Sequence, residues 1–144
     1  MKRISFILAT ILLCVSFVSC EKDGTTKTED FLQGTWIQLS GNNYWEDGVL
    51  KVTDYYEFKD GIWTQYATYH AATYNNGVLH YEKAFERNFS GGYEVRDGYL
   101  YYLGSGERLE KVNNDKFTLS LGGVSEVWER IKEFKQEDPS FFGK

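Results

Sequence analysis

The sequence predicts an all-β fold, an antiparallel up-and-down meander of about eight strands that closes into a small barrel behind a short helical turn. One observation is a series of turn signals, because Asx-Gly pairs supply the positive φ angles that tight hairpins require. These signals occur at Asp60-Gly61, Asn76-Gly77, Asp97-Gly98, Asn113-Asn114-Asp115 and Gly122-Gly123. A second observation is that the runs between the signals are rich in Tyr, Thr, Val, Phe and Trp, which favour strands. A third is that no segment of 34–131 carries a sustained helical period.

The runs expected to form strands are 35–39, 52–58, 62–69, 78–87, 93–103 with an interruption at 97–98, 108–112, 117–121 and 124–131. Phe117, Leu119 and Leu121 alternate with polar residues, which predicts a sheet with one covered face and one wet face. Such a sheet avoids exposed edges by closing, and an eight-stranded barrel is either filled by side chains or holds one small ligand. Bulky pairs such as Tyr55-Tyr56 blur the alternation, so an open meander or flattened sandwich stays as the alternative.

The N-terminus has the pattern of a secretory signal peptide over residues 1–19. Lys2 and Arg3 precede an apolar run over 4–18, which is shorter than the roughly 20 residues that a membrane-spanning helix needs. The run ends at Ser19-Cys20 and resembles a bacterial lipobox, although an ordinary signal peptide is the alternative. The resemblance implies that the mature chain starts at Cys20 and that its acylated thiol anchors it in the lipid bilayer. We therefore expect a place in the cell envelope, on the outer membrane, and the sequence leaves its surface or periplasmic face open.

Three further segments follow the signal peptide. Residues 20–29 are polar and without periodicity, which predicts a flexible linker after the lipidated cysteine. Thr28 followed by Glu29 and Asp30 favours the start of a short helical turn. The barrel is expected over 30–132, and 133–144 are expected to form a polar C-terminal tail.

Composition narrows the function classes. The chain has 16 Lys and Arg against 21 Asp and Glu, and removal of Lys2 and Arg3 with the signal peptide makes it more acidic still. Nucleic acid is therefore not an expected partner, because its recognition requires a basic surface. With 11 Tyr, 10 Phe and 4 Trp, the chain is rich in rings that suit half-buried strands and binding faces.

Gly34-Thr35-Trp36, at the start of the first expected strand, resembles the Gly-x-Trp motif that opens the lipocalin fold. The resemblance implies that a basic residue near the end of the last strand lies across the Trp ring, and Arg130 is the match. Trp36 and Arg130 would then latch the first strand to the last. The layout over 31–132 is similar to small lipocalin-like domains of lipoproteins from Bacteroidetes. The chain departs from a typical lipocalin because it is shorter and lacks a disulfide, a second motif and a C-terminal helix.

No residue pattern supports catalysis, so we expect no enzyme activity and no cofactor. His80 and Glu82 share one face of an expected strand, but a catalytic zinc needs three protein ligands and no third partner is recognisable. We therefore predict no metal site. The chain also lacks a Gly-x-Ser-x-Gly nucleophile motif and a phosphate-binding loop.

The density of aromatic rings is the remaining functional signal. Trp45 lies in the irregular stretch 42–51, which would cover the mouth of a lipocalin-like barrel, and is the preferred contact residue. The complete set of predicted ligand-binding residues is Trp45, Tyr56, Tyr66, Tyr81 and Tyr102. The leading hypothesis is non-enzymatic binding of a small hydrophobic or extended ligand. The alternatives are a filled barrel that binds glycan or docks on an envelope complex, and an inhibitor of an envelope-directed enzyme that acts through 42–51. The oligomeric state is not predicted.

Overall fold

A computed structural model describes residues 23–143 of the chain, so the predicted signal peptide and Cys20 lie outside the described residues. Its elements are α1 (Asp23–Leu32), β1 (Gly34–Gln38), β2 (Tyr44–Glu46), β3 (Val49–Lys51), β4 (Asp54–Lys59), β5 (Ile62–Ala67), β6 (Ala72–Asn75), β7 (Val78–Tyr81), β8 (Glu86–Gly92), β9 (Glu94–Arg96), β10 (Tyr99–Tyr102), β11 (Ser105–Asn113), β12 (Lys116–Leu121), β13 (Val124–Arg130), β14 (Glu133–Gln136) and the 3-10 helix η1 (Pro139–Phe141). Within this range, no helix combines the length and the apolar character needed to cross a membrane.

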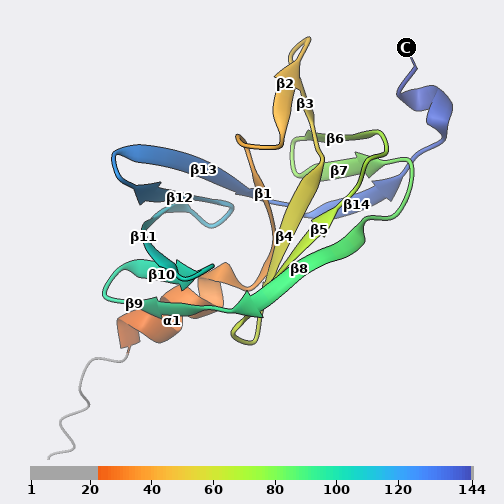
Figure 1. Ribbon diagram of the computed structural model, residues 1–144. Coiled ribbons are helices and arrows are strands. Elements are labelled where there is room, and N and C mark those ends of the chain that lie inside the picture. Colours follow the sequence, from red (N-terminus) through yellow and green to blue (C-terminus); the bar gives the residue numbers. More distant parts are fainter. Residues whose placement is uncertain (1–22, 144) are drawn as a thin grey trace, which may run out of the picture.

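The main sheet is antiparallel and nearly closed, which confirms the predicted all-β barrel (Figure 1). Its strand order is β8-β5-β4-β1-β13-β12-β11-β10-β9. The two edge strands of this sheet, β8 and β9, follow each other in the chain, because only Tyr93 separates them. β8 and β9 therefore act as one long strand that pairs with β5 at one end and β10 at the other. β1, the first strand of the barrel, pairs with β13, its last strand, and Trp36 lies opposite Arg130.

The hairpin turns follow the predicted chemistry. Asp60, Asn76 and Asp97 have φ angles of 51°, 50° and 54°, and each precedes a glycine that also has positive φ. Such pairs match the twist of two-residue hairpins. Asp47-Gly48 has the same geometry and forms a further hairpin within 42–51, a stretch that the sequence analysis treated as irregular.

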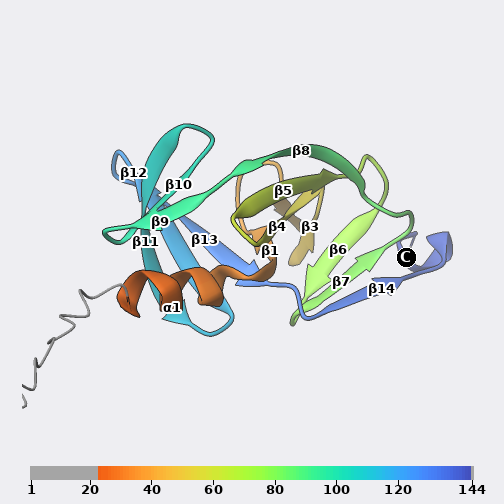
Figure 2. The ribbon, with the colours of Figure 1, turned by 90° about the horizontal axis from the view of Figure 1, so that it is seen from below.

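A second sheet, with the order β14-β7-β6-β3-β2, packs beside the barrel (Figure 2). Most of it comes from two hairpins, β2–β3 and β6–β7, inserted between strands of the barrel. A second hydrophobic cluster joins this sheet to the outer face of the barrel, and its buried members are Ile37, Leu50, Val52, Ala72, Tyr74, Leu79 and Ile131. Bulky residues on both faces of β1 and β4 are thereby explained, because the outward face of these strands is also covered.

Both ends of the domain differ from the prediction. The expected linker 20–29 is helical from Asp23, since α1 runs to Leu32 and lies along the lower end of the barrel (Figure 2). Phe31 and Leu32 pack into the barrel core, and this tertiary contact explains a helix that local propensity does not favour. The expected tail 133–144 contains β14, which pairs in parallel with β7, and η1.

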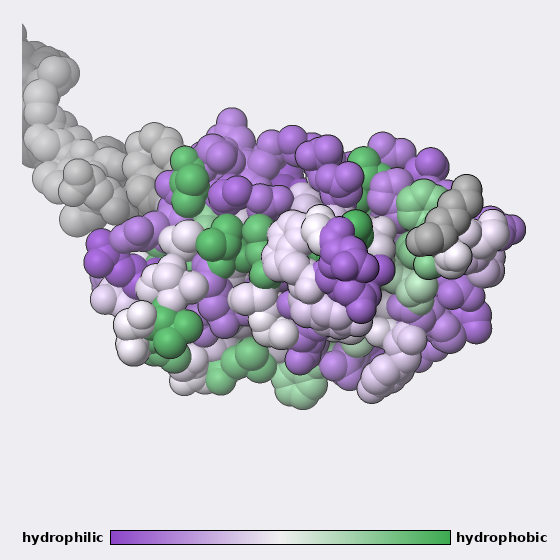
Figure 3. Space-filling model, turned by 90° about the horizontal axis from the view of Figure 1, so that it is seen from above, coloured by the Kyte–Doolittle hydropathy of each residue, from purple (hydrophilic) through white to green (hydrophobic). Residues whose placement is uncertain are grey.

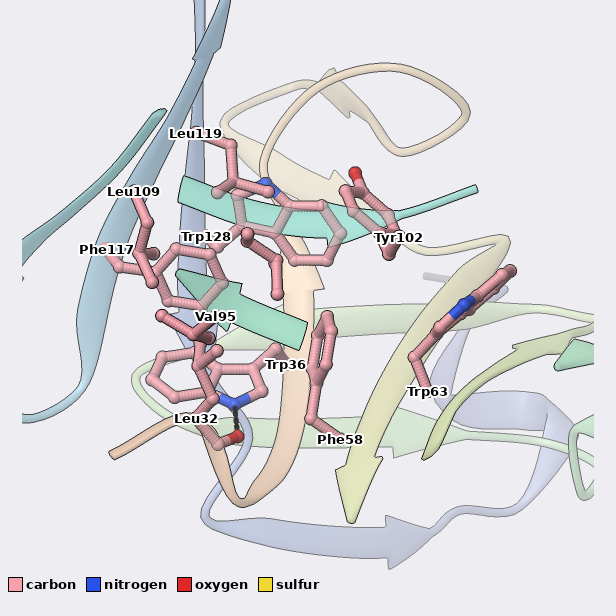
Figure 4. Close-up of a cluster of buried hydrophobic side chains, with 11 residues drawn as sticks. Leu32, Trp36, Phe58, Trp63, Val95, Tyr102, Leu109, Phe117, Leu119 and Trp128 are labelled. Carbon is pink, nitrogen blue, oxygen red and sulfur yellow. Dashed lines mark hydrogen bonds between the residues drawn. The ribbon is translucent and has the colours of Figure 1, made fainter. Parts of the chain in front are cut away.

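The core of the barrel is largely aromatic (Figure 4). Its buried members are Leu32, Trp36, Phe58, Trp63, Val95, Leu100, Tyr102, Leu109, Phe117, Leu119 and Trp128. The rings contact one another in series: Trp36 lies 4.7 Å from Phe117 and Phe117 lies 5.6 Å from Trp128, measured between ring centroids. Packed side chains therefore fill the interior of the barrel from the end next to α1 to its middle.

Candidate functional site

The closing contact of the barrel has the geometry that the lipocalin resemblance implied. The guanidinium carbon of Arg130 lies 4.1 Å from the centroid of the Trp36 ring. Its Nη1 and Nη2 donate hydrogen bonds to the backbone oxygens of Gln33 and Phe31, both at 2.7 Å. The indole nitrogen of Trp36 donates to the Leu32 oxygen at 2.7 Å. These contacts tie the end of α1 to both the first and the last strand of the barrel.

Gly34 is required in this arrangement for a steric reason. Its φ of 120° lies where side chains are rarely tolerated, and a Cβ there would come within 2.6 Å of Nη1 of Arg130. Gly34 and Trp36 therefore both accommodate the Arg130 guanidinium where it crosses the first strand: the glycine leaves space for it, and the tryptophan ring packs against it.

Tyr56 and Tyr102 are the two predicted ligand-binding residues that the structure brings together, and both point into the barrel. Tyr102 is buried and its ring lies 5.9 Å from Trp63, while the Tyr56 ring lies 4.9 Å from Trp128. Burial raises the pKa of both hydroxyls, with a further contribution from nearby carboxylates, Glu107 for Tyr102 and Asp54 for Tyr56. Both hydroxyls therefore remain protonated donors.

Tyr66 and Tyr81 lie outside the barrel interior, so the predicted set does not form one site. Tyr66 stacks on Tyr55 with ring centroids 4.9 Å apart, on the outward face of β4 and β5. Tyr81 packs against the second cluster, with its ring 6.4 Å from Phe85. Tyr81 therefore lies at the interface between the barrel and the second sheet, whereas Tyr66 covers Tyr55, which packs against that interface.

Trp45 lies on the β2–β3 hairpin, which projects from the body of the molecule (Figure 1). Its side chain is 60% exposed, although it is one of the largest apolar side chains in the protein. It borders a hollow of about 220 Å³ whose other walls include Leu39, Tyr74, Asn76 and Glu129. An exposed indole at the edge of a hollow is suited to contact a ligand rather than to stabilise the core.

A second hollow of about 530 Å³ adjoins the first and shares Tyr74, Asn76 and Glu129 with it. We call the two together the Trp45 groove. Its far end is formed by the β11–β12 turn with Lys116 and by Lys132. Figure 3 views the molecule from the side of the hairpin, where hydrophilic residues predominate and apolar residues form small separate patches.

The charged groups of the Trp45 groove are paired with one another. Nζ of Lys116 lies 2.7 Å from Glu129, and Nζ of Lys132 lies 2.6 Å from Asp115. The backbone carbonyl of Arg130 accepts a hydrogen bond from the Tyr74 hydroxyl at 3.1 Å, which fixes the buried floor. The groove therefore offers a hydrogen-bonding surface without a strong charge of either sign.

Asn75 and Asn76 are among the groove residues that sequence reasoning did not select as contacts. Both are exposed beside the hollow, and no side-chain hydrogen bond involves them within residues 23–143. Asn76 was identified only as part of a turn signal. The Asp47-Gly48 pair was a signal in the sequence that would have placed Trp45 on a hairpin, beside its turn.

His80 has a different partner from the one considered in the sequence. Its Nδ1 lies 2.9 Å from Oε1 of Glu137, and its ring stacks on Phe141 with centroids 5.2 Å apart. The hydrogen bond with His80 lowers the pKa of Glu137 below its ordinary value. This contact fastens the C-terminal segment to β7. Over the described range, no group of three or more His, Cys, Asp or Glu side chains is arranged to hold a metal ion.

No protein-family model, curated protein or solved structure matches this chain. The function is therefore inferred from the geometry of the barrel, of its closing contact and of the Trp45 groove.

Proposed function

We propose that this protein is a non-enzymatic, lipid-anchored protein of the cell envelope that binds neutral carbohydrate in the Trp45 groove. The observation that carries the proposal is the exposed indole of Trp45 beside a groove lined by amides and internally paired charges. A planar ring packs against the C–H face of a sugar, while amides and carboxylates exchange hydrogen bonds with its hydroxyls. Because the charges in the groove are already paired, a neutral oligosaccharide fits better than a charged one.

The packing of the barrel supports a filled barrel over one that encloses a hydrophobic ligand. Trp36, Phe58 and Phe117 have no exposed surface, and their rings belong to one continuous cluster. Entry of an apolar ligand into this region would require displacement of packed rings, which is costly in interiors of native density. Binding on the outer groove requires no such displacement.

Replacement of Trp45 by Ala is expected to weaken oligosaccharide binding about tenfold or more, because a central aromatic contact contributes over about 1.4 kcal/mol. Calorimetry with the purified protein and cellohexaose, maltohexaose or mannohexaose measures the effect. Tyr69→Ala is the matched control, since Tyr69 is fully exposed and lies outside the groove. Equal affinity in the Trp45 variant would refute the site, and no binding to any of the three sugars would refute the function.

Replacement of Cys20 by Ala is expected to release the protein from membranes or to stall its processing, because it removes the thiol at the predicted acylation position. Fractionation of cells that express the two forms checks this expectation. Incorporation of labelled palmitate into the original chain, and none into the variant, provides the control. Unchanged membrane association of the variant would contradict lipidation at Cys20.

A further inference from the structure

The inward-facing side chains change character along the barrel. At the α1 end they are apolar and aromatic, and Arg130 and Lys111 lie there over the rings of Trp36 and Phe31. At the opposite end the inward positions become acidic or amide-bearing. We call this region the polar end, and it consists of Asp54, Tyr56, Gln65, Tyr102, Glu107 and Glu126.

Strand alternation places these carboxylates inside the barrel. Glu126 is two residues before Trp128 on β13, and Glu107 is two residues before Leu109 on β11, so each shares the inward face of a core residue. The charge of Glu126 also acts on Glu107. Burial, and then the negative charge of Glu126, raise the pKa of Glu107.

The carboxylates of the polar end lack a paired cation among the described residues. Within residues 23–143, none of the ion pairs includes Asp54, Glu107 or Glu126. Asp54 is satisfied by a hydrogen bond from Nε2 of Gln65 at 3.1 Å. Glu107 and Glu126 therefore form a pair of neighbouring, partly buried acids without a counterion in the part of the chain that the structure describes.

An independent observation in the same region is a donor without an acceptor. The Trp128 side chain is only 1% exposed, and within residues 23–143 its indole N–H, like that of Trp63, has no hydrogen-bond partner. In Figure 4 this nitrogen lies at the same end of the core as the Tyr102 hydroxyl, opposite the nitrogen of Trp36, which is bonded to Leu32. A buried N–H without a partner is rare in native proteins, and a ligand oxygen would satisfy it.

From these two observations we propose that the polar end binds a small organic ammonium ion that also carries an acceptor oxygen. The ammonium group would lie between Glu107 and Glu126, and the oxygen would accept the Trp128 N–H. The rings of Tyr56 and Tyr102 add cation–π attraction. This site is separate from the Trp45 groove, because the two share no residue.

The test uses three probes of matched size on the purified protein. Ethanolamine has both the charge and the oxygen, propylammonium has the charge alone, and ethylene glycol has no charge. We expect ethanolamine to bind, propylammonium to bind about threefold to tenfold more weakly, and ethylene glycol to show no binding. In nuclear magnetic resonance spectra the Trp128 indole signal should move with ethanolamine, while that of Trp36 should stay in place.

Glu107→Gln combined with Glu126→Gln is expected to weaken ethanolamine binding about tenfold or more without loss of folding, since it removes a like-charge contact. Glu110→Gln is the matched control, because Glu110 lies on the outward face of the same strand and pairs with Arg108. An unmoved Trp128 signal, or equal ethanolamine affinity in the double variant, would overturn the proposal. Neither result would bear on the proposal that the Trp45 groove binds carbohydrate.

Discussion

Trp36→Ala is expected to lower the free energy of unfolding by about 3 to 5 kcal/mol, the usual cost of removing a large aromatic side chain from a core. Trp36 has no exposed surface, and its ring contacts Phe31 and Phe117 at centroid distances of 5.3 and 4.7 Å. The substitution also leaves the Leu32 oxygen without its donor. Trp36 contacts α1 and lies where the first strand pairs with the last strand of the barrel. Its removal would therefore leave a cavity at the contact that holds the barrel closed.

Denaturant unfolding followed by circular dichroism measures this effect. Trp45→Ala is the internal control, because it removes the same side chain from an exposed position and should change stability by about 0.5 kcal/mol or less. Trp36→Phe should retain a large part of the stability, since it keeps an aromatic ring but loses the indole N–H. A loss of under about 1 kcal/mol in Trp36→Ala would show that this ring is not central to the core.

Arg130→Ala is expected to lower the free energy of unfolding by about 2 to 3 kcal/mol, as for other hydrogen bonds to charged groups. Its guanidinium donates to the backbone oxygens of Phe31, Gln33 and Asn114, so its loss would leave three acceptors without this partner. Burial lowers the pKa of Arg130, an effect opposed by the nearby carboxylate of Asp115. The hydrogen bonds of Arg130 therefore hold a guanidinium that is partly removed from water.

Arg130→Lys distinguishes this geometry from charge alone. A lysine keeps the positive charge, but it lacks the planar fork that reaches two carbonyls while it lies over an indole. We expect the lysine variant to recover less than half of the lost stability in the same unfolding experiment. A lysine variant as stable as the original protein would contradict a role for the two carbonyl hydrogen bonds.

The turns and the closing strands could be predicted because their signals are local or stereochemically strict. Asp60-Gly61 and Asn76-Gly77 adopt positive φ at both residues, as hairpin pairs do. Gly34, Trp36 and Arg130 were selected through their resemblance to the lipocalin Gly-x-Trp motif and its basic partner. In the structure the Arg130 guanidinium lies over the Trp36 ring and leaves no room for a Cβ at position 34.

The second sheet could not be predicted from alternation. Tyr55 and Tyr56 occupy opposite faces of β4, and a pattern of bulky residues on both faces does not say what covers the outer one. β14 pairs with β7 in parallel across a long stretch of chain, which no local pattern encodes. Leu103 adopts a φ of 50° before Gly104, so a turn forms there without an Asx residue to signal it.

The candidate site was predicted only in part. Trp45 was identified because core packing does not explain a tryptophan in a polar, irregular stretch. In the structure this residue is exposed beside a groove. Tyr66 and Tyr81 were grouped with it by composition, whereas Tyr81 packs against the second cluster and Tyr66 stacks on Tyr55. The groove partners on β13 and on the β6–β7 turn come together only through the tertiary fold.

Mapping of chemical shifts in the isotopically labelled protein, titrated with cellohexaose, maltohexaose and mannohexaose, tests most directly whether carbohydrate binds outside a filled barrel. We expect the Trp45 indole and the amides of Asn75 and Asn76 to shift with the sugar that binds, while the signals of Phe58 and Leu100 stay in place. Shifts centred on those buried residues, or no shifts with any of the three sugars, would contradict this account.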